Sequence, residues 1–217
     1  TDGTITSQVS ANVDAGFSVV KYTGNSTAGA TVGHGLSEVP EMIIVKIASG
    51  NIGNWAIFHK DVGATKFLMF TSGAAQTNIA WWNNTAPSSS VFSLGTVSDT
   101  NTSPYGYIAY AFHSVDGYSK IGSYTGTGAT GNTIVTGFRP AFVMIKASSA
   151  SGSWYMFDDK RLTSPYSDQL IANSSAAEAT GTYVDLDSNG FTLNTTASDL
   201  NNSGVTFIFM AFAADPT

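Results

Sequence analysis

Two aspartates near the C-terminal end of the chain have the spacing of a calcium-binding loop. In the segment VDLDSNGFTLN, Asp185, Asp187 and Asn189 supply side-chain oxygens at alternate positions, and Gly190 follows them. Such a loop also needs a bidentate carboxylate at its twelfth position, and that position is Thr196. The pair Asn189-Gly190 between two strand-like runs is typical of a β-hairpin. The segment therefore favours a hairpin turn, with a weakly bound calcium ion as the alternative.

A tryptophan pair points to a second kind of chemistry, the binding of sugars. Trp81 and Trp82 are followed by Asn83 and Asn84 in the segment IAWWNNT. The apolar face of a pyranose stacks on an indole ring, and amides hydrogen-bond to its hydroxyl groups. Neighbouring residues of a strand point to opposite faces, so one indole is expected to be exposed if the other lies in the core. The alternative is that both rings pack between strands.

Catalytic chemistry finds little support in the sequence. The chain has no cysteine, which excludes disulfides, thiolate metal sites and thiol nucleophiles. Its three histidines are isolated from one another, and there is no Gly-x-Ser-x-Gly motif. The nearest acidic pairs, Asp158 with Asp159 and Glu38 with Glu41, stand without the further acids expected around a hydrolytic site. We therefore predict no catalytic residues and a protein that is not an enzyme.

Composition narrows the class of protein further. Only 11% of the 217 residues are charged while 12% are aromatic, and no window sustains the 3.6-residue apolar spacing of a helix. We therefore expect an all-β fold with very little helix. The net charge of −6 and the lack of Lys/Arg runs argue against nucleic acid as a partner. No apolar stretch has the length of a membrane span, and the first residues do not resemble a signal peptide, so we expect a processed part of a longer protein.

An internal repeat with a period of about 100 residues organises the chain. Residues 16–36 correspond to 117–138, residues 39–61 to 139–160, residues 89–95 to 188–194, and residues 105–115 to 204–214. Positions kept in both copies are those that a shared fold needs, and unshared positions are freer to serve function. The shared positions are Tyr22/Tyr124, Gly24/Gly126, Pro40/Pro140, Lys46/Lys146, Trp55/Trp154, Phe58/Phe157, Phe92/Phe191, Leu94/Leu193 and Phe112/Phe212.

Each copy has six or seven short runs rich in β-branched and aromatic residues, separated by Gly, Asn, Ser, Thr or Pro. The sequence thus predicts an antiparallel β-sandwich built from two tandem repeats with a pseudo-twofold relation. Residues 1–15 are expected to form an N-terminal arm or linker, residues 16–115 the first repeat, and residues 116–217 the second. The join between the repeats is short, so the second is expected to dock rigidly on the first.

Several of these motifs resemble a known but poorly characterised family. GFSVVKYTGNSTAGATVGHGLSEVPEMIIVK, WWNNTAPSSSVFSLG, GYSKIGSYTGTG and TGFRPAFVMIK are similar to a β-rich domain of tailed-bacteriophage structural proteins, especially from marine and cyanobacterial hosts. In tail-fibre proteins it often follows lectin-like laminin-G modules. The resemblance spans residues 16–214 and carries no defined catalytic or binding residues.

The resemblance implies a component of the virion, exposed on the particle surface. The function expected from it is a non-enzymatic adhesion module of a tail fibre or spike that binds glycans or another receptor on the host surface. The alternative is a purely structural virion component, a capsid decoration or tail-assembly domain, whose partners are other virion proteins. By analogy with fibres, a homo-oligomer is expected, with a trimer as the leading form. No cofactor is expected apart from the calcium ion considered above.

Overall fold

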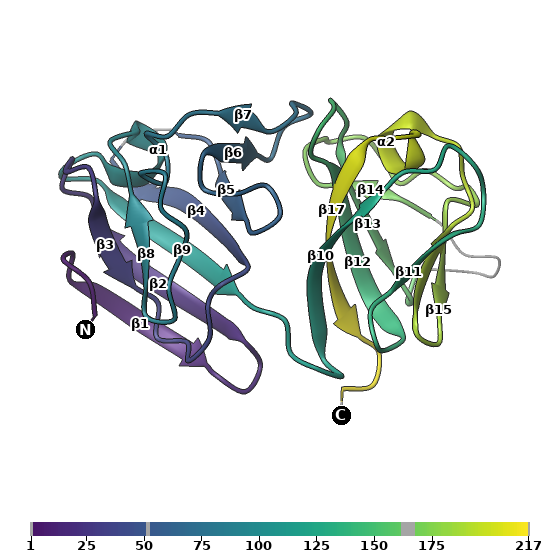
Figure 1. Cartoon of the computed structure of the whole chain (residues 1–217), viewed down its shortest axis with the longest axis horizontal. Coiled ribbons are helices and arrows are strands. Elements are labelled where there is room, and N and C mark those ends of the chain that lie inside the picture. Colours follow the sequence, from purple (N-terminus) through teal and green to yellow (C-terminus); the bar gives the residue numbers. More distant parts are fainter. Residues whose placement is uncertain (1, 51–52, 162–167, 217) are drawn as a thin grey trace. The chain divides into compact units, whose positions relative to one another are not determined.

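A computed structural model describes residues 2–50, 53–161 and 168–216 of the chain. The regular secondary structure of these residues is almost entirely β, with two helices of four residues each (Figure 1). This confirms the predicted all-β, antiparallel class. The chain divides into two compact units: unit 1 comprises Thr1–Phe70 and Ala75–His113, and unit 2 comprises Thr71–Ala74 and Ser114–Thr217.

Unit 1 contains a large sheet and a small one. The small sheet pairs β3 (Ala30–Gly33) with β8 (Val91–Leu94) in antiparallel register. The large sheet is antiparallel and has seven strands, in the order β1 (Ser7–Asn12), β2 (Phe17–Thr23), β9 (Gly106–Phe112), β4 (Met42–Ser49), β5 (Ala56–His59), β6 (Lys66–Met69) and β7 (Gln76–Thr77). The nearly continuous apolar runs of β4 and β9 thus occupy central positions, as such runs predict.

The core of unit 1 lies between these two sheets. Alternate residues of β4, namely Ile43, Val45 and Ile47, point into it and meet Phe92 and Leu94 of β8. Because side chains alternate along a strand, the residues between them point to the opposite, outer face of the large sheet. This outer face carries the candidate site described below.

Unit 2 has the same sandwich-like character. A five-stranded antiparallel sheet has the order β10 (Ser119–Thr125), β17 (Thr206–Ala213), β12 (Pro140–Ala147), β13 (Trp154–Asp158) and β14 (Leu170–Ile171). A three-stranded sheet has the order β11 (Asn132–Val135), β16 (Gly190–Leu193) and β15 (Val184–Asp187). Phe157, Phe191 and Phe207 fill the core between these sheets and are fully buried.

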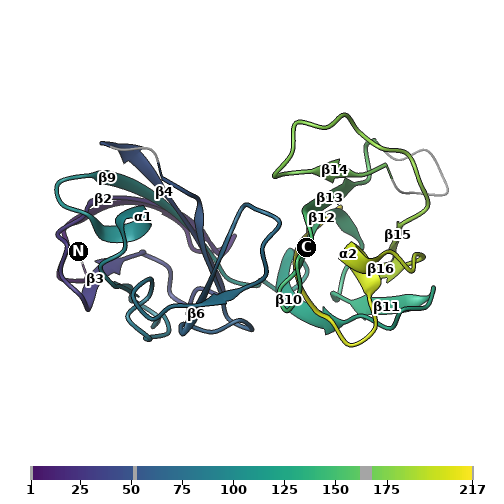
Figure 2. The ribbon, with the colours of Figure 1, turned by 90° about the horizontal axis from the view of Figure 1, so that it is seen from above.

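One short helix lies at an end of each unit, α1 (Ser98–Asn101) in unit 1 and α2 (Ser198–Asn201) in unit 2 (Figure 2). Each ends in a buried asparagine. Asn101 donates from Nδ2 to the carbonyl oxygens of Thr27 (3.0 Å) and Gly95 (2.8 Å), and its Oδ1 accepts the backbone N–H of Asn25 (2.9 Å). These bonds satisfy backbone groups of loops that carry no strand partner.

Asn201 makes the corresponding bonds in unit 2. Its Nδ2 donates to the carbonyl oxygens of Ala129 (2.7 Å) and Thr195 (2.9 Å), and its Oδ1 accepts the backbone N–H of Thr127 (2.9 Å). Each asparagine therefore fastens a loop to its short helix. We call Asn101 and Asn201 the hub asparagines.

A tyrosine on the core side hydrogen-bonds to each short helix. The Tyr22 hydroxyl donates to the Thr100 carbonyl at 2.7 Å, and the Tyr124 hydroxyl donates to the Leu200 carbonyl at 2.6 Å. Each tyrosine also stacks on a ring of the neighbouring strand, Tyr22 on Tyr107 and Tyr124 on Phe207. Burial raises the pKa of both hydroxyls well above 10, so both stay protonated and donate.

The N-terminal residues differ from the expected arm or linker. Ser7–Asn12 form strand β1, which pairs with β2 along its whole length and is the edge strand of the large sheet. The Ser7 hydroxyl donates to the Gly33 carbonyl at 3.2 Å, which fastens β1 to the end of β3. The segment is polar because an edge strand with little burial needs few apolar side chains.

Candidate functional site

The structure buries both members of the predicted sugar-binding pair. Trp81 and Trp82 are 4% and 1% exposed, and they pack against Phe67 and Phe58 with ring centroids 3.8 and 5.9 Å apart. The expectation of one exposed indole is therefore wrong. It assumed a strand, whereas residues 79–84 form turns, so side chains do not alternate there.

Asn83 and Asn84 do lie at the surface, but they have no exposed ring beside them from the tryptophan pair. Both adopt left-handed backbone conformations, with φ of 52° and 49°, which asparagine tolerates better than most residues. Their role in the fold is thus to reverse the chain after the two buried indoles. They do not form a glycan-binding site with Trp81 or Trp82 in this conformation.

The predicted hairpin is present around the aspartates, one residue earlier than expected. Asp187 pairs with Gly190, so the two turn residues are Ser188 and Asn189. The carboxylates are already engaged, because Asp187 accepts the Thr192 hydroxyl at 2.6 Å and Asp185 accepts the Asn194 side-chain amide. Among the described residues there is no group of three His, Asp or Glu side chains that could hold a metal ion. A calcium ion here would have to replace these two hydrogen bonds.

The exposed tryptophan is a different one, Trp55. It is 39% exposed, whereas its counterpart Trp154 in unit 2 is 1% exposed. Trp55 directly precedes β5, and its neighbour Ala56 is fully buried, so the indole belongs to the outer face of the large sheet. A solvent-facing indole of this kind supplies the apolar surface that a sugar ring requires.

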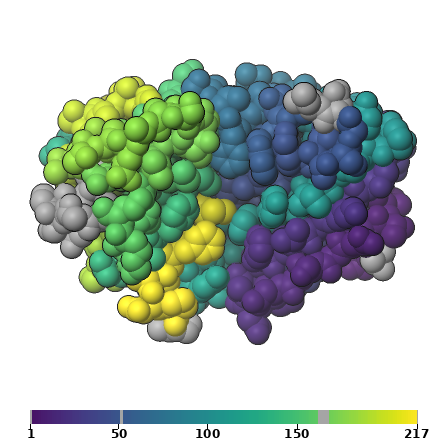
Figure 3. Space-filling view, turned by 180° about the vertical axis from the view of Figure 1, so that it is seen from behind, coloured from purple at the N-terminus to yellow at the C-terminus, as the bar shows by residue number. Residues whose placement is uncertain are grey.

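Strand register places Trp55 at one end of a line of side chains that crosses the sheet. Gln8 pairs with Lys21, Lys21 with Ile108, and Ile108 with Lys46. Val45 pairs with Ala56, and Ala56 with Met69, so the next residue pairs are Lys46 with Trp55 and Trp55 with Phe70. We call this line the transverse row; it comprises Gln8, Lys21, Ile108, Lys46, Trp55 and Phe70. Figure 3 shows the face that carries it, with purple β1 and β2, teal β9 and blue β4 following one another across the surface.

The indole of Trp55 is held by contacts with its two neighbours in the transverse row, Lys46 and Phe70. The Lys46 ammonium lies 5.8 Å from the Trp55 ring centroid and donates to the Gly53 carbonyl. The Phe70 ring meets the indole edge-on, with centroids 5.9 Å apart at 75°. Cation–π and edge-to-face contacts each favour a fixed ring orientation. The indole is therefore positioned before any ligand arrives.

An amide is fixed beside the indole in the same way. The buried Asp99 carboxylate on α1 accepts the backbone N–H of Asn54 at 2.8 Å with one oxygen and the Asn54 side-chain amide at 3.3 Å with the other. Both oxygens of Asp99 are thus engaged by the residue before Trp55. The side-chain carbonyl of Asn54, which is exposed, is left to accept from an incoming hydroxyl group.

The polar end of the row opens on a pocket. It has a volume of about 480 Å³ and is lined by Ile5, Thr6, Gln8, Lys21, Tyr22 and Thr23. Alternation places Thr6, Gln8, Lys21 and Thr23 on the outer face, since Ser7 and Tyr22 between them point inward. Two hydroxyls, an amide and an ammonium therefore converge at this end, and all four can donate hydrogen bonds.

The corresponding line of side chains in unit 2 is largely inaccessible to solvent. Ser123 stands where unit 1 has Lys21, and Lys146 and Trp154 are fully buried. Lys146 donates from Nζ to the Ala147 carbonyl at 2.6 Å, and burial lowers its pKa from 10.5 to about 8, against the opposing effect of Asp199. In the described parts of the two units, the accessible version of the row therefore belongs to unit 1.

Sequence reasoning missed this site because it classed Lys46 and Trp55 with the shared, architectural positions. The signal that could have indicated the site was the set of residues in and beside the row that differ between the two aligned segments. Lys21 corresponds to Ser123, and Asn54 to Ser153, in the aligned copies. Differences of this kind next to a shared aromatic residue are the signal in the sequence that could have pointed to this candidate site.

The fold defines a class of protein, a two-unit antiparallel β-protein. Neither helix in the described part of the chain is long and apolar enough to cross a membrane. The chain belongs to the family described as Domain of unknown function (DUF7483), whose family model matches residues 1–216. No curated protein and no solved structure matches the chain.

Proposed function

We propose that this protein is a non-enzymatic component of a tailed-bacteriophage virion, an adhesion module of a tail fibre or spike that binds glycans on the host surface. The phage context rests on the sequence motifs that resemble virion proteins. The binding role rests on one observation, an exposed and preorganised indole in a row that also carries the hydrogen-bond donors Gln8, Lys21 and Lys46. The membership of an uncharacterised family is compatible with this proposal and does not by itself favour it.

The dimensions of the transverse row suit a polysaccharide better than a single sugar. Neighbouring strands lie about 4.8 Å apart, so six side chains on adjacent strands span roughly 24 Å. A chain of several sugar rings covers such a length. Contacts spread along the face of a sheet favour an extended chain, whereas a monosaccharide site is usually concave and encloses its ligand.

The row also supports binding without cleavage. Hydrolysis of a glycosidic bond by the common mechanism needs two carboxyl groups on opposite sides of that bond. None of the six side chains of the row is acidic, and the neighbouring Asp99 has both oxygens engaged by Asn54. A protein that binds a glycan with these groups holds it and leaves it intact.

The alternative, a purely structural virion component, is favoured by a different feature. Strand β1 pairs with β2 on one side, and no backbone hydrogen bond of the described residues joins its other side to a further strand. Its sequence SQVSAN has no charge and no proline, and its register with β2 has no bulge, although natural edge strands usually carry such protection. A strand of another virion protein, or of a second copy in an oligomer such as a trimer, would extend the sheet there.

Binding to host cells and to a glycan array tests the adhesion role. We expect the purified chain to bind, and Trp55→Ala to reduce binding at least tenfold because the stacking surface is lost. Trp55→Phe keeps an aromatic ring and should retain part of the affinity. Val135→Ala is the control, since it removes an apolar side chain that is 64% exposed and belongs to unit 2, which contributes no residue to the row.

Wild-type protein that binds neither host cells nor any glycan would argue against adhesion and favour the structural alternative. Equal binding by wild type and Trp55→Ala would leave adhesion in place but remove the transverse row as its site.

A further inference from the structure

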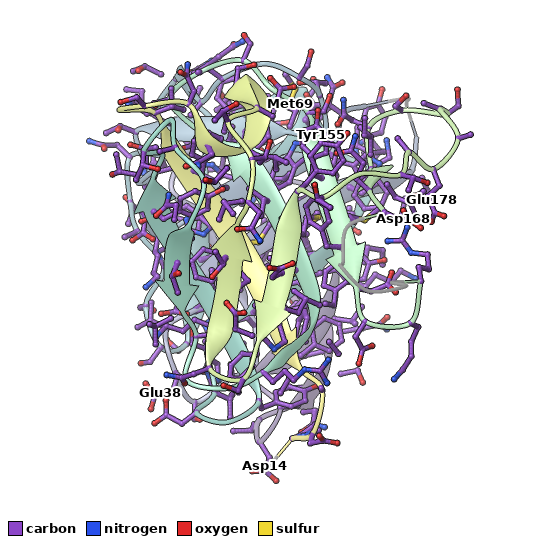
Figure 4. The ribbon with its side chains drawn as sticks, turned by 90° about the vertical axis from the view of Figure 1, so that its right-hand side faces the viewer. Asp14, Glu38, Met69, Tyr155, Asp168 and Glu178 are labelled. Carbon is purple, nitrogen blue, oxygen red and sulfur yellow. The ribbon has the colours of Figure 1, made fainter. Side chains whose placement is uncertain are left out.

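Four of the acidic residues of unit 1 lie at one end of the large sheet. Asp14 lies in the loop between β1 and β2, Glu38 and Glu41 precede β4, and Asp61 follows β5. These positions share one end of the large sheet, because Met42 at the start of β4 pairs with His59 at the end of β5. Figure 4 shows Asp14 and Glu38 at this end and Met69, next to Phe70 of the row, at the other. The two lysines of the row thus stand apart from these four acids.

Lys21 is the more available of these two lysines. It is exposed and lines the pocket, and none of the described salt bridges involves it. Gln8 is its direct cross-strand neighbour, and Thr6 and Thr23 share the same face. An ammonium group surrounded by an amide and two hydroxyls, with no carboxylate in the lining, matches the needs of an anionic oxygen group.

We infer that the pocket around Lys21 takes the carboxylate or sulfate group of an acidic polysaccharide whose sugar rings extend along the transverse row toward Trp55. This inference rests on the proposed glycan-binding function and names the class of glycan. Lys46, two strands from Lys21, adds a second positive charge about 10 Å further along the row. Acidic groups that recur along a polysaccharide can therefore meet both lysines.

Because the protein has a negative net charge, its attraction for an acidic polysaccharide must come from the positive side chains of the row. At −6 the whole chain repels a polyanion, so attraction cannot come from the general field of the protein. Hydrogen bonds to charged groups are stronger than neutral ones and correspond to about a tenfold change in affinity or more. The Debye length near physiological ionic strength is about 8 Å, so added salt weakens this contribution.

Two matched pairs of polymers test the inference: polygalacturonate with its methyl ester, and dextran sulfate with dextran. Each pair keeps the backbone and removes the charge. Binding of immobilised full-length chain to all four is measured by biolayer interferometry at 50 mM and 300 mM NaCl. We expect the acidic member of at least one pair to bind about tenfold more tightly at low salt, and this preference to shrink at high salt.

The variants separate local from general charge effects. Lys21→Gln should abolish the preference for the acidic member, and Lys66→Gln, which removes an equally exposed charge elsewhere on the same sheet, should leave it unchanged. Equal binding of charged and uncharged members, or an equal loss in both variants, would overturn the acidic-ligand inference while leaving glycan binding intact. Absence of binding to all four polymers and to a glycan array would overturn the proposed function together with the inference.

Discussion

At the scale of single residues, the hub asparagine Asn101 gives a sharp test of what holds a loop to the fold. Both of its amide protons point at carbonyl oxygens, those of Thr27 and Gly95. Asn101→Asp keeps the shape but places an acceptor against these two acceptors. We expect a loss of about 3 kcal/mol in the free energy of unfolding, because hydrogen bonds are lost and a buried charge faces carbonyl dipoles.

Urea denaturation followed by circular dichroism measures this loss. Asn83→Asp is the matched control, since Asn83 is exposed and its side chain makes none of the described buried bonds. An Asn101→Asp midpoint within error of the wild type would show that the amide is not what fastens the loop.

Lys146 gives a prediction about pH. Its pKa is about 8 in the folded protein and 10.5 when unperturbed, so between these values the unfolded chain holds a proton that the folded chain has released. Stability contributed by this group therefore rises with pH across the window from about 8 to 10.5. At about 1.4 kcal/mol per pKa unit, this shift of about 2.5 units gives a total of at most about 3.5 kcal/mol.

The measurement compares the wild type with Lys146→Met, which has no proton to release. We expect the unfolding free energy of the wild type, relative to that of the variant, to rise between pH 7.5 and 10. The comparison cancels the titration of tyrosines, which both proteins share. A constant difference over this range would show that the ammonium is not desolvated.

At the scale of elements, two glycines show how closely loops approach the short helices. A Cβ on Gly126 would lie 2.1 Å from the Asn202 carbonyl oxygen, and one on Gly24 would lie 2.5 Å from that of Thr102. Gly126→Ala must therefore displace backbone, at an expected cost of at least about 2 kcal/mol.

Thermal or urea unfolding of Gly126→Ala measures this cost. Gly131→Ala is the control in the same region, because a Cβ there meets nothing within 4 Å and only the positive φ of 85° opposes it, at about 1 kcal/mol. A similar loss in both variants would mean that steric approach is not the reason for glycine at 126.

The elements that the sequence predicted well are those with long apolar runs. Strands β4 and β9 have the nearly continuous apolar runs that are typical of central strands, and both lie at central positions of the large sheet. The hairpin at residues 184–193 was also expected, but a turn shift of one residue depends on side-chain bonds such as that from Thr192 to Asp187, which the dipeptide Asn-Gly does not encode. Strand β1 was missed because its pairing supplies backbone bonds without an apolar pattern.

At the scale of the whole molecule, tryptophan fluorescence reports on the transverse row, because the exposed tryptophan belongs to it. Of the four tryptophans, Trp55 is 39% exposed, and Trp81, Trp82 and Trp154 are at most 4% exposed. Acrylamide should therefore quench mainly Trp55, and Trp55→Phe should remove most of the quenchable fluorescence. Saturating glycan should protect the wild type in the same way.

A Stern–Volmer plot measures both effects, with Val135→Ala as a variant expected to behave like the wild type. Unchanged quenching in Trp55→Phe would mean that another indole is accessible in solution, which contradicts the described burial.

The transverse row could not be predicted from the sequence, although each of its residues is visible there. Its members come from positions 8 to 108, and only the register of the strands brings Gln8, Lys21 and Lys46 into one line. A shift of one residue in any strand would send its side chain to the core face. Local patterns specify strands, whereas this site depends on how distant strands pair.

The hub asparagines bear on how such a protein can change over time. They fasten loops and short helices at the end of each unit, while the transverse row uses side chains that point away from the core. Substitutions along the row therefore leave the interactions that hold the fold together untouched. Under the proposed adhesion role, variants that recognise a new surface can arise one residue at a time without passing through an unfolded intermediate, which is the property that a lineage under pressure to switch hosts requires.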